Sequence, residues 1–260
     1  MIHSFTASGR FFLIVAALFC AGCASQKTSS TTPRQRALLL VQAAQGALQE
    51  GDRVAAFNYL KSAQELDDSC AEIFHMRGIA FMSKRDLAKA LIEFKTAAKL
   101  APESSSIANT YGKVLLDSGK WELAETELLK AADDPTFSEA YKALTSLGIM
   151  YEKRGDKRKA EEYYQKAIQE NSALACIAYQ RRAQVRAEDG RLQSAQKDLE
   201  KATGGQCVGN IEGQFALGDL YEKRQNLDKA REKYLEIQQQ FPDSAQAEEA
   251  VKRLRKLTIE

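Results

Sequence analysis

The chain has 260 residues, of which 44% are hydrophobic and 28% are charged, as in an ordinary soluble globular protein. Its 37 basic and 35 acidic residues nearly cancel, which argues against a nucleic-acid-binding protein. The polar residues are mostly Lys, Glu, Gln and Arg beside abundant Ala and Leu, so helices are favoured over strands. Only two histidines are present, which argues against a histidine-based metal site or catalytic triad.

The first 22 residues have the pattern of a secretory signal peptide. Arg10 is the only charged residue before Lys27, and residues 11–19 form an apolar run that is followed by small residues. This run is shorter than the about 20 residues that a membrane-spanning helix needs. We therefore expect residues 1–22 to be removed; a short anchor that is retained is the alternative.

The signal peptide ends in Ala21-Gly22-Cys23, which resembles the lipobox of bacterial lipoproteins, although Cys20 stands where Leu is usual. The resemblance implies that Cys23 is lipidated and begins the mature chain, so that its acyl chains hold the protein on a membrane. Ala24 replaces the Asp that favours retention at the inner membrane, which points to the outer membrane. Residues 23–36 are mostly polar, and we expect them to form a flexible tether.

The rest of the chain repeats about every 34 residues. Position 20 of each unit is Ala, position 8 is Gly or Ala, and position 24 is bulky. The small residues let two antiparallel helices, A and B, approach closely, and the bulky residue fills the remaining groove. Gly or Asp near positions 15 and 16 makes the turn, and Pro near position 32 of two units ends helix B. The six units are 37–70, 71–104, 105–138, 141–174, 176–209 and 211–244, all within 37–244.

This pattern is that of the tetratricopeptide repeat (TPR), which implies an all-α, right-handed superhelix of six helix–turn–helix repeats. Two extra residues separate units three and four, in the segment 133–139. Unit five fits least well, because Arg182 and Arg186 lie on its first helix. Residues 245–260 have apolar side chains at helical spacing and are expected to form a C-terminal capping helix with a polar outer face.

The sequence contains no recognisable catalytic constellation. Asp67-Asp68 and Asp133-Asp134 are adjacent carboxylates at repeat ends, where acids cap helices and line loops, whereas an acid–base pair needs two carboxylates across a cleft. We therefore expect no enzymatic activity, no cofactor and no metal. An enzyme whose site is not recognised is the alternative.

After loss of the signal peptide and lipidation of Cys23, three cysteines remain: Cys70, Cys176 and Cys207. Cys176 begins helix A of unit five, and Cys207 follows its helix B. Because these two ends of an antiparallel pair lie together, we expect a disulfide between Cys176 and Cys207, with Cys70 free. The alternative is that both cysteines stay reduced.

A TPR solenoid turns its A helices inward, so that positions 2, 5, 9, 12 and 13 face a ligand. These positions are more apolar in units one to three than in units four and six, where they include Lys142, Thr145 and Ile149. We expect the partner to bind an exposed apolar patch along the first two or three A helices. The alternative is that unit one packs these residues on its own N-terminal segment. The expected groove residues are Leu38, Val41, Leu48, His75, Ile79, Met82, Asn109 and Leu116.

A signal peptide, a lipobox and six TPRs together resemble the outer-membrane lipoproteins that act as pilotins in type IV pilus biogenesis (PilF/PilW type). The segments 128–135, 147–148 and 160–164 are similar to the central part of that family, and the remaining match is to TPRs in general. The resemblance implies a monomeric, lipid-anchored scaffold that faces the periplasm, binds a secretin subunit and helps the secretin to reach the outer membrane and multimerise. The alternative, suggested by residues 239–244, is an adaptor for outer-membrane protein assembly or peptidoglycan enzymes.

Overall fold

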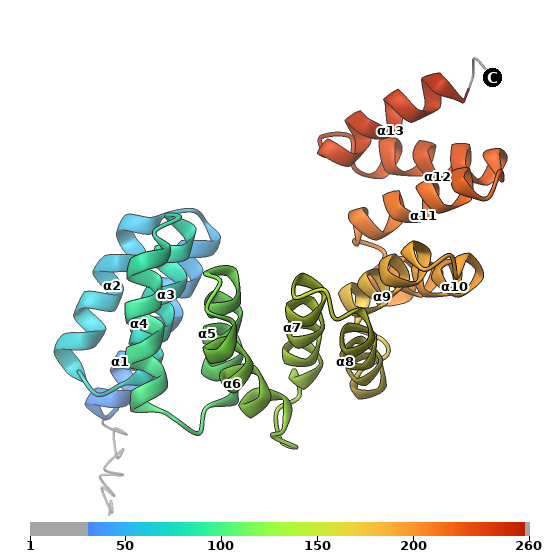
Figure 1. Ribbon diagram of the computed structural model, residues 1–260. Helices are drawn as coiled ribbons and strands as arrows, with labels where there is room; N and C mark the ends of the chain where they lie inside the picture. Colours follow the sequence, from blue (N-terminus) through green and yellow to red (C-terminus); the bar gives the residue numbers. More distant parts are fainter. Residues whose placement is uncertain (1–30, 258–260) are drawn as a thin grey trace, which may run out of the picture.

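The computed structural model describes residues 31–257, and this part of the chain forms thirteen α-helices and one 3-10 helix, with no strand. Figure 1 shows the helices stacked in chain order, which confirms the expected helical TPR solenoid. Among these helices, none has the length and apolar character needed to cross a membrane. In chain order the elements are α1 (Pro33–Gln49), α2 (Arg53–Leu66), α3 (Ala71–Ser83), α4 (Leu87–Leu100), α5 (Ser105–Asp117), α6 (Trp121–Ala132), α7 (Ala140–Lys153), α8 (Lys157–Glu170), α9 (Cys176–Glu188), α10 (Leu192–Thr203), η1 (Gly205–Cys207), α11 (Ile211–Lys223), α12 (Leu227–Gln240) and α13 (Ala245–Lys256).

Odd-numbered helices from α1 to α11 are the A helices, even-numbered helices are the B helices, and α13 follows the sixth pair. The helices α3, α5, α9 and α11 begin at the first residue that the repeat phase gives for their units, and α7 begins one residue earlier than expected, at Ala140.

The expected tether boundary at residue 36 is wrong, because α1 begins at Pro33. The backbone N–H of Gln35 donates to the hydroxyl of Thr32 at 3.2 Å, and the Gln35 side chain accepts from the Thr32 N–H at 2.8 Å. This capping box, with Pro33 in the first turn, begins the helix before the repeat pattern does. The expected signal peptide, Cys23 and residues 24–30 lie outside the described part of the chain.

Position 15 has a left-handed backbone in every repeat. It is Gly51, Gly119, Gly155 or Gly190 in four repeats, with φ between 72° and 82°. In repeats two and six it is Arg85 (φ 58°) and Gln225 (φ 60°), which have a Cβ that this conformation disfavours. The next residue caps helix B in most repeats; Asp52 Oδ1, for example, accepts from the Ala55 N–H at 2.9 Å.

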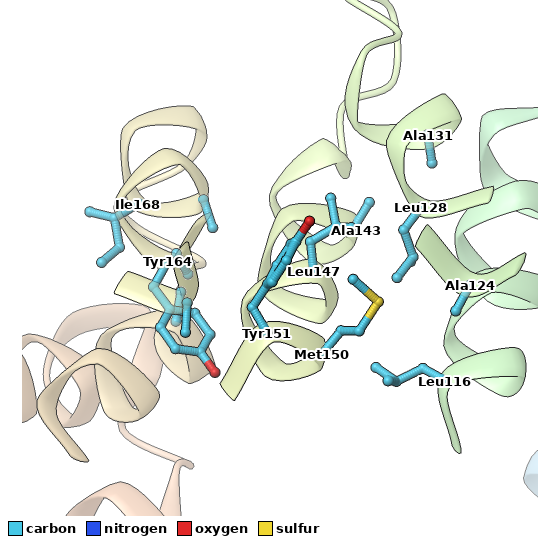
Figure 2. Close-up of a cluster of buried hydrophobic side chains, with 14 of the residues drawn as sticks. Leu116, Ala124, Leu128, Ala131, Ala143, Leu147, Met150, Tyr151, Tyr164 and Ile168 are labelled. Atoms are coloured by element: carbon cyan, nitrogen blue, oxygen red, sulfur yellow. The ribbon is translucent and has the colours of Figure 1, made fainter. Parts of the chain in front are cut away.

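The core follows the repeat pattern. A Cβ on Gly148 would lie 2.4 Å from the ring of Tyr164, and one on Gly218 would lie 2.6 Å from the ring of Tyr234, so these two repeats have no room for a side chain at position 8. Figure 2 shows how Leu147 and Met150 of α7 face Leu128 of α6 in the core that joins repeats three and four. The position-20 alanines have no exposed surface: Ala56, Ala90, Ala124, Ala160, Ala195 and Ala230.

The two arginines that depart from the pattern in repeat five belong to a partly buried ionic network. Arg182, which is 6% exposed, donates to both carboxylate oxygens of Asp198 at 2.8 and 2.6 Å. Arg186 donates to Asp198 at 2.9 Å and to Glu161 of α8 at 2.7 Å. Repeats four and five are therefore joined by charged contacts, in which each buried ion has its partner.

Candidate partner-binding site along the A helices

The expected apolar patch on the first A helices is not an exposed surface. Val41 is 8% and Leu116 is 4% exposed, and both belong to the core. The other residues of the expected groove are half-buried. Leu38, Leu48 and Ile79 pack against the core of the first two repeats, and Met82 packs against the core around Phe94. The expectation of an exposed patch was wrong, because neighbouring A helices pack on one another there. These apolar side chains therefore lie between the helices.

His75 is a packing residue in this structure. Its ring lies edge-on to Phe94, with 5.6 Å between the ring centroids. Burial lowers the pKa of His75 below its usual range, and the opposing effect of Glu72 does not cancel this, so the ring is neutral at pH 7. Within residues 31–257 no three His, Cys, Asp or Glu side chains are grouped so that they could hold a metal ion.

A groove of about 520 Å³ lies further along the A helices, between α5, α7 and the beginning of α9. We call it the A-helix groove. Its apolar wall includes Ile149, Leu174 and Ile177, of which Leu174 is 46% and Ile177 is 45% exposed. The groove is lined by Asn109, Thr110, Lys113, Glu139, Tyr141, Lys142, Thr145, Ser146, Ile149, Leu174, Ala175 and Ile177.

The polar side of the A-helix groove offers donors to a ligand. Asn109 and Lys113 make no side-chain hydrogen bond or ion pair to any other described residue. Lys142 donates to Glu139. The hydroxyls of Thr145 and Ser146 donate to backbone carbonyls of their own helix, at 2.6 and 3.0 Å, so they present only acceptors to the groove. The arrangement suits a peptide segment that has aliphatic side chains and an acidic or carbonyl group.

Some of the residues that line this groove lie at positions that the repeat pattern turns towards a partner. Asn109 was expected to face the partner and lines the groove, as do Lys142, Thr145 and Ile149 at the equivalent positions of repeat four. The groove is nevertheless centred on repeats three to five, and not on the first repeats. Leu174 was missed because it is the last residue of repeat four, in the loop between α8 and α9, where the repeat pattern specifies no contact. Ile177 could have been found, because it occupies position 2 of repeat five.

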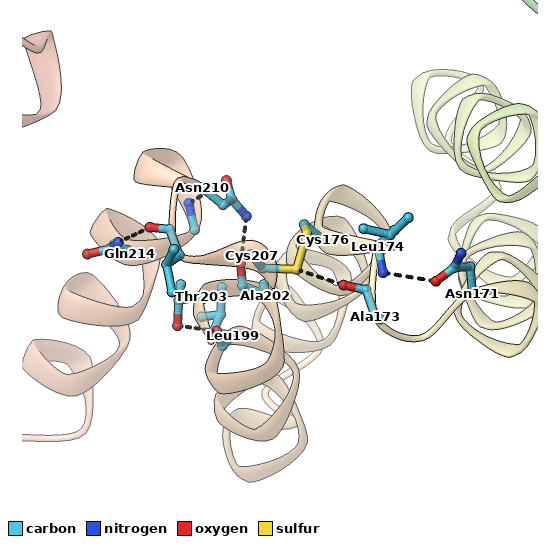
Figure 3. Close-up of a disulfide and its surroundings, with 12 residues drawn as sticks. Asn171, Ala173, Leu174, Cys176, Leu199, Ala202, Thr203, Cys207, Asn210 and Gln214 are labelled. Atoms are coloured by element: carbon cyan, nitrogen blue, oxygen red, sulfur yellow. Dashed lines mark hydrogen bonds between the residues drawn. A yellow bond between two sulfur atoms is a disulfide. The ribbon is translucent and has the colours of Figure 1, made fainter. Parts of the chain in front are cut away.

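Cys176 and Cys207 are joined by a disulfide in the structure, with 5.5 Å between their Cα atoms (Figure 3). The bond connects the beginning of α9 to η1, after the end of α10. The same loop is fixed by Asn210, whose amide donates to the Ala202 carbonyl at 3.0 Å. Because Ile177 follows Cys176 directly, this bond also holds one wall of the A-helix groove in place. Cys70 is free and buried.

Comparison with known proteins gives two kinds of similarity. The tetratricopeptide repeat family matches residues 141–173 and 181–245. The type IV pilus assembly protein PilF of Pseudomonas aeruginosa is 24% identical over 210 residues, which cover 80% of this chain and 82% of PilF.

Two solved structures share the fold. A structure of Pseudomonas aeruginosa PilF superposes with a TM-score of 0.70 at 21% identity, over 84% of this chain and 97% of that one. The crystal structure of PilW, a widely conserved type IV pilus biogenesis factor, gives a TM-score of 0.70 at 21% identity, over 83% of this chain and 98% of that one. The chain is therefore a tetratricopeptide-repeat protein and a homologue of the type IV pilus assembly protein PilF.

Proposed function

We propose that this protein is a pilotin of a type IV pilus system: a non-enzymatic, lipid-anchored scaffold that brings secretin subunits to the outer membrane and assists their multimerisation. The observation that carries the proposal is the sequence similarity to PilF, because it extends over 80% of the chain and is not confined to one repeat. The repeats supply a surface for protein binding, and lipidation at Cys23 would supply the attachment to the membrane.

The A-helix groove is the site that we assign to the secretin segment. Ile149, Leu174 and Ile177 would contact its aliphatic side chains, while Asn109 and Lys113 would bind its carboxylate or carbonyl groups. A large part of the side chains of Leu174 and Ile177 is in contact with water in the free protein, so covering them contributes the hydrophobic part of binding. The charged and amide groups contribute orientation.

The proposal is tested by isolating the tagged full chain from detergent-solubilised membranes and measuring how much secretin accompanies it. We expect secretin with the wild-type chain and about a tenfold lower recovery with Leu174→Glu combined with Ile177→Glu, because a charge on this wall must be desolvated on binding. Val208→Glu is the matched control, since Val208 is also exposed, at 58%, but lies outside the groove.

Two results would contradict the proposal. One is that the wild-type chain brings down no secretin but brings down an outer-membrane insertion factor or a peptidoglycan enzyme, which would support the adaptor alternative. The other is that Cys23→Ala leaves the protein in the outer-membrane fraction, because lipidation of Cys23 is the proposed anchor.

A further inference from the structure

A second groove, of about 640 Å³, lies along the B helices, between α4 and α6. We call it the B-helix groove. Leu91 and Ile92 of α4 and Leu123 of α6 line it, with Tyr111 of α5 behind them. Ile92 is 65% and Leu123 is 57% exposed. Two large aliphatic side chains that are mostly exposed on facing helices make an apolar surface of the kind that marks an interaction site.

The next repeat has an aromatic side chain at the equivalent seam. Tyr163 of α8 stacks on Tyr151 with 5.3 Å between the ring centroids, and it packs against the core that α6, α7 and α8 share. The residue at the same position of repeat three is Glu127, whose carboxylate binds Lys130 at 3.3 Å. The Glu127 side chain, which is 18% exposed, therefore lies where the next repeat has a larger aromatic ring. The equivalent seam between α6 and α8 also has a groove, but Tyr163 lines it and its volume is smaller, about 360 Å³.

The rim of the B-helix groove is positively charged. Lys95, Lys99 and Lys120 border it, and none of the three forms an ion pair or a side-chain hydrogen bond with another residue of the described chain. The single acidic residue of the lining, Glu127, is already paired with Lys130. A ligand with carboxylates beside its apolar side chains would complement these charges.

We propose that the B-helix groove binds an amphipathic helix of a partner protein, with aliphatic side chains on one face and carboxylates along both edges of that face. The walls, α4 and α6, are helices of 14 and 12 residues, and so are roughly 20 Å long. A helix can lay its side-chain ridge between them, as helices do in bundles. An extended segment is a poorer occupant, because helices offer it no free backbone groups with which to pair.

The B-helix groove is separate from the proposed secretin site, because it lies on other helices than the A-helix groove and would bind another ligand. The probe is a synthetic, fluorescein-labelled peptide of about 18 residues, with Leu and Ile at helical spacing and Glu on both flanks, measured by fluorescence polarisation against the full chain in detergent. We expect saturable binding. Ile92→Glu combined with Leu123→Glu should weaken it about tenfold, and Lys95→Glu combined with Lys99→Glu about threefold, with a larger effect at low salt.

Two control variants separate the alternatives. Lys61→Glu reverses a charge at the position of repeat one that corresponds to Lys95, and it should leave the affinity unchanged. Ile177→Glu alters the A-helix groove, so unchanged peptide binding by this variant is expected even if the proposed secretin site fails. Circular dichroism of each variant confirms that the helices are intact.

Three outcomes would overturn the inference. The first is that a peptide of the same composition in scrambled order, or one with Lys in place of Glu, binds equally well. The second is that the variants at Ile92 and Leu123 bind as the wild type does. The third is a dimer of the free chain, seen by sedimentation, that Ile92→Glu converts to a monomer; the occupant would then be a second copy of this chain.

Discussion

At the scale of single residues, the close contact between positions 8 and 24 controls how helix A meets helix B. Gly148 and Tyr164 show this most clearly, because a Cβ on Gly148 would lie 2.4 Å from the ring. The Tyr164 hydroxyl also binds Glu152, so the ring cannot move aside without breaking a hydrogen bond. In repeat five the same two positions are Ala183 and Leu199, and both are buried. Repeat five thus pairs a larger residue at position 8 with a smaller one at position 24, as repeat one does with Ala44 and Leu60.

Gly148→Ala should therefore destabilise the protein by roughly 1–3 kcal/mol, the usual cost of overpacking. Adding Tyr164→Leu should recover part of this loss, because it recreates the pair found in repeat five. The free energies of unfolding come from urea titrations followed by circular dichroism. A Gly148→Ala variant that unfolds at the same urea concentration as the wild type would contradict this steric explanation. So would a double variant whose loss of unfolding free energy equals the sum of the losses of the two single variants.

At position 15, by contrast, a substitution is expected to raise the stability. Arg85 has φ 58°, where a residue with a Cβ is disfavoured by roughly 1–2 kcal/mol, and four other repeats have Gly there. Arg85→Gly should raise the stability by about 1 kcal/mol after the extra freedom of Gly in the unfolded chain is counted. Lys84→Gly is the control, since Lys84 has φ −89° and should only lose stability. A lower urea midpoint for Arg85→Gly would contradict this reasoning.

At the scale of elements, repeat five is held by two features that the other repeats lack: the disulfide and the network around Arg182. The disulfide closes a loop with a sequence separation of 31 residues. In the chain-entropy account such a bond stabilises by roughly 3–4 kcal/mol. We expect Cys176→Ser combined with Cys207→Ser to lower the urea midpoint, and a reductant to lower that of the wild type but not that of the double variant.

Cys70 is the internal control for this measurement. Burial, followed by the nearby Glu72, raises the pKa of the Cys70 thiol to about 11, so in the folded protein it should react slowly with alkylating agents. After unfolding without reductant, peptide mapping should find Cys70 alkylated and Cys176 linked to Cys207. Alkylation of all three cysteines under these conditions would show that the disulfide does not form.

The ionic network predicts a dependence of stability on pH. Hydrogen bonds from Arg191 and Arg186 hold the pKa of Glu161 below its usual range, against the effect of burial. As the pH falls, the unfolded chain therefore takes up this proton first, so the stability that Glu161 contributes is complete above about pH 4.5 and is lost below it. Glu161→Gln should lower the stability at pH 7 and flatten its decline between about pH 5 and pH 3.

Glu162→Gln is the matched control for the pH experiment, because the Glu162 side chain is 56% exposed and its only ion pair within residues 31–257, to Arg158, is 3.9 Å long. The stability of the Glu162→Gln variant should equal that of the wild type at each pH. A decline for Glu161→Gln that is as steep as that of the wild type would mean that other carboxylates cause the acid sensitivity.

At the scale of the whole molecule, the repeat pattern predicted the fold because its rules are local and recur. Positions 8, 20 and 24 specify how one A helix meets its own B helix, and α3, α5, α9 and α11 begin where this phase places them. The beginning of α1 was missed because Thr32 and Gln35 form a capping box that lies outside the repeat.

The candidate site was harder to predict, because it depends on contacts between repeats. Whether a residue such as Val41 or Leu116 is exposed is decided by how closely neighbouring A helices pack, and the pattern within one repeat does not contain this distance. Leu174 lies at the end of repeat four, in the loop between α8 and α9, where no helical periodicity applies. The groove between α4 and α6 likewise depends on how neighbouring B helices pack, which the pattern within one repeat does not contain.

We propose that this protein binds a secretin in its A-helix groove and brings it to the outer membrane. The most direct test measures multimeric secretin in outer membranes of cells that lack the protein and are complemented with variants. We predict that the wild type and Val208→Glu restore the multimer, and that Leu174→Glu combined with Ile177→Glu does not, although it is folded and present at the same level. Equal amounts of multimer in cells without the protein, or full restoration by the groove variant, would contradict the account.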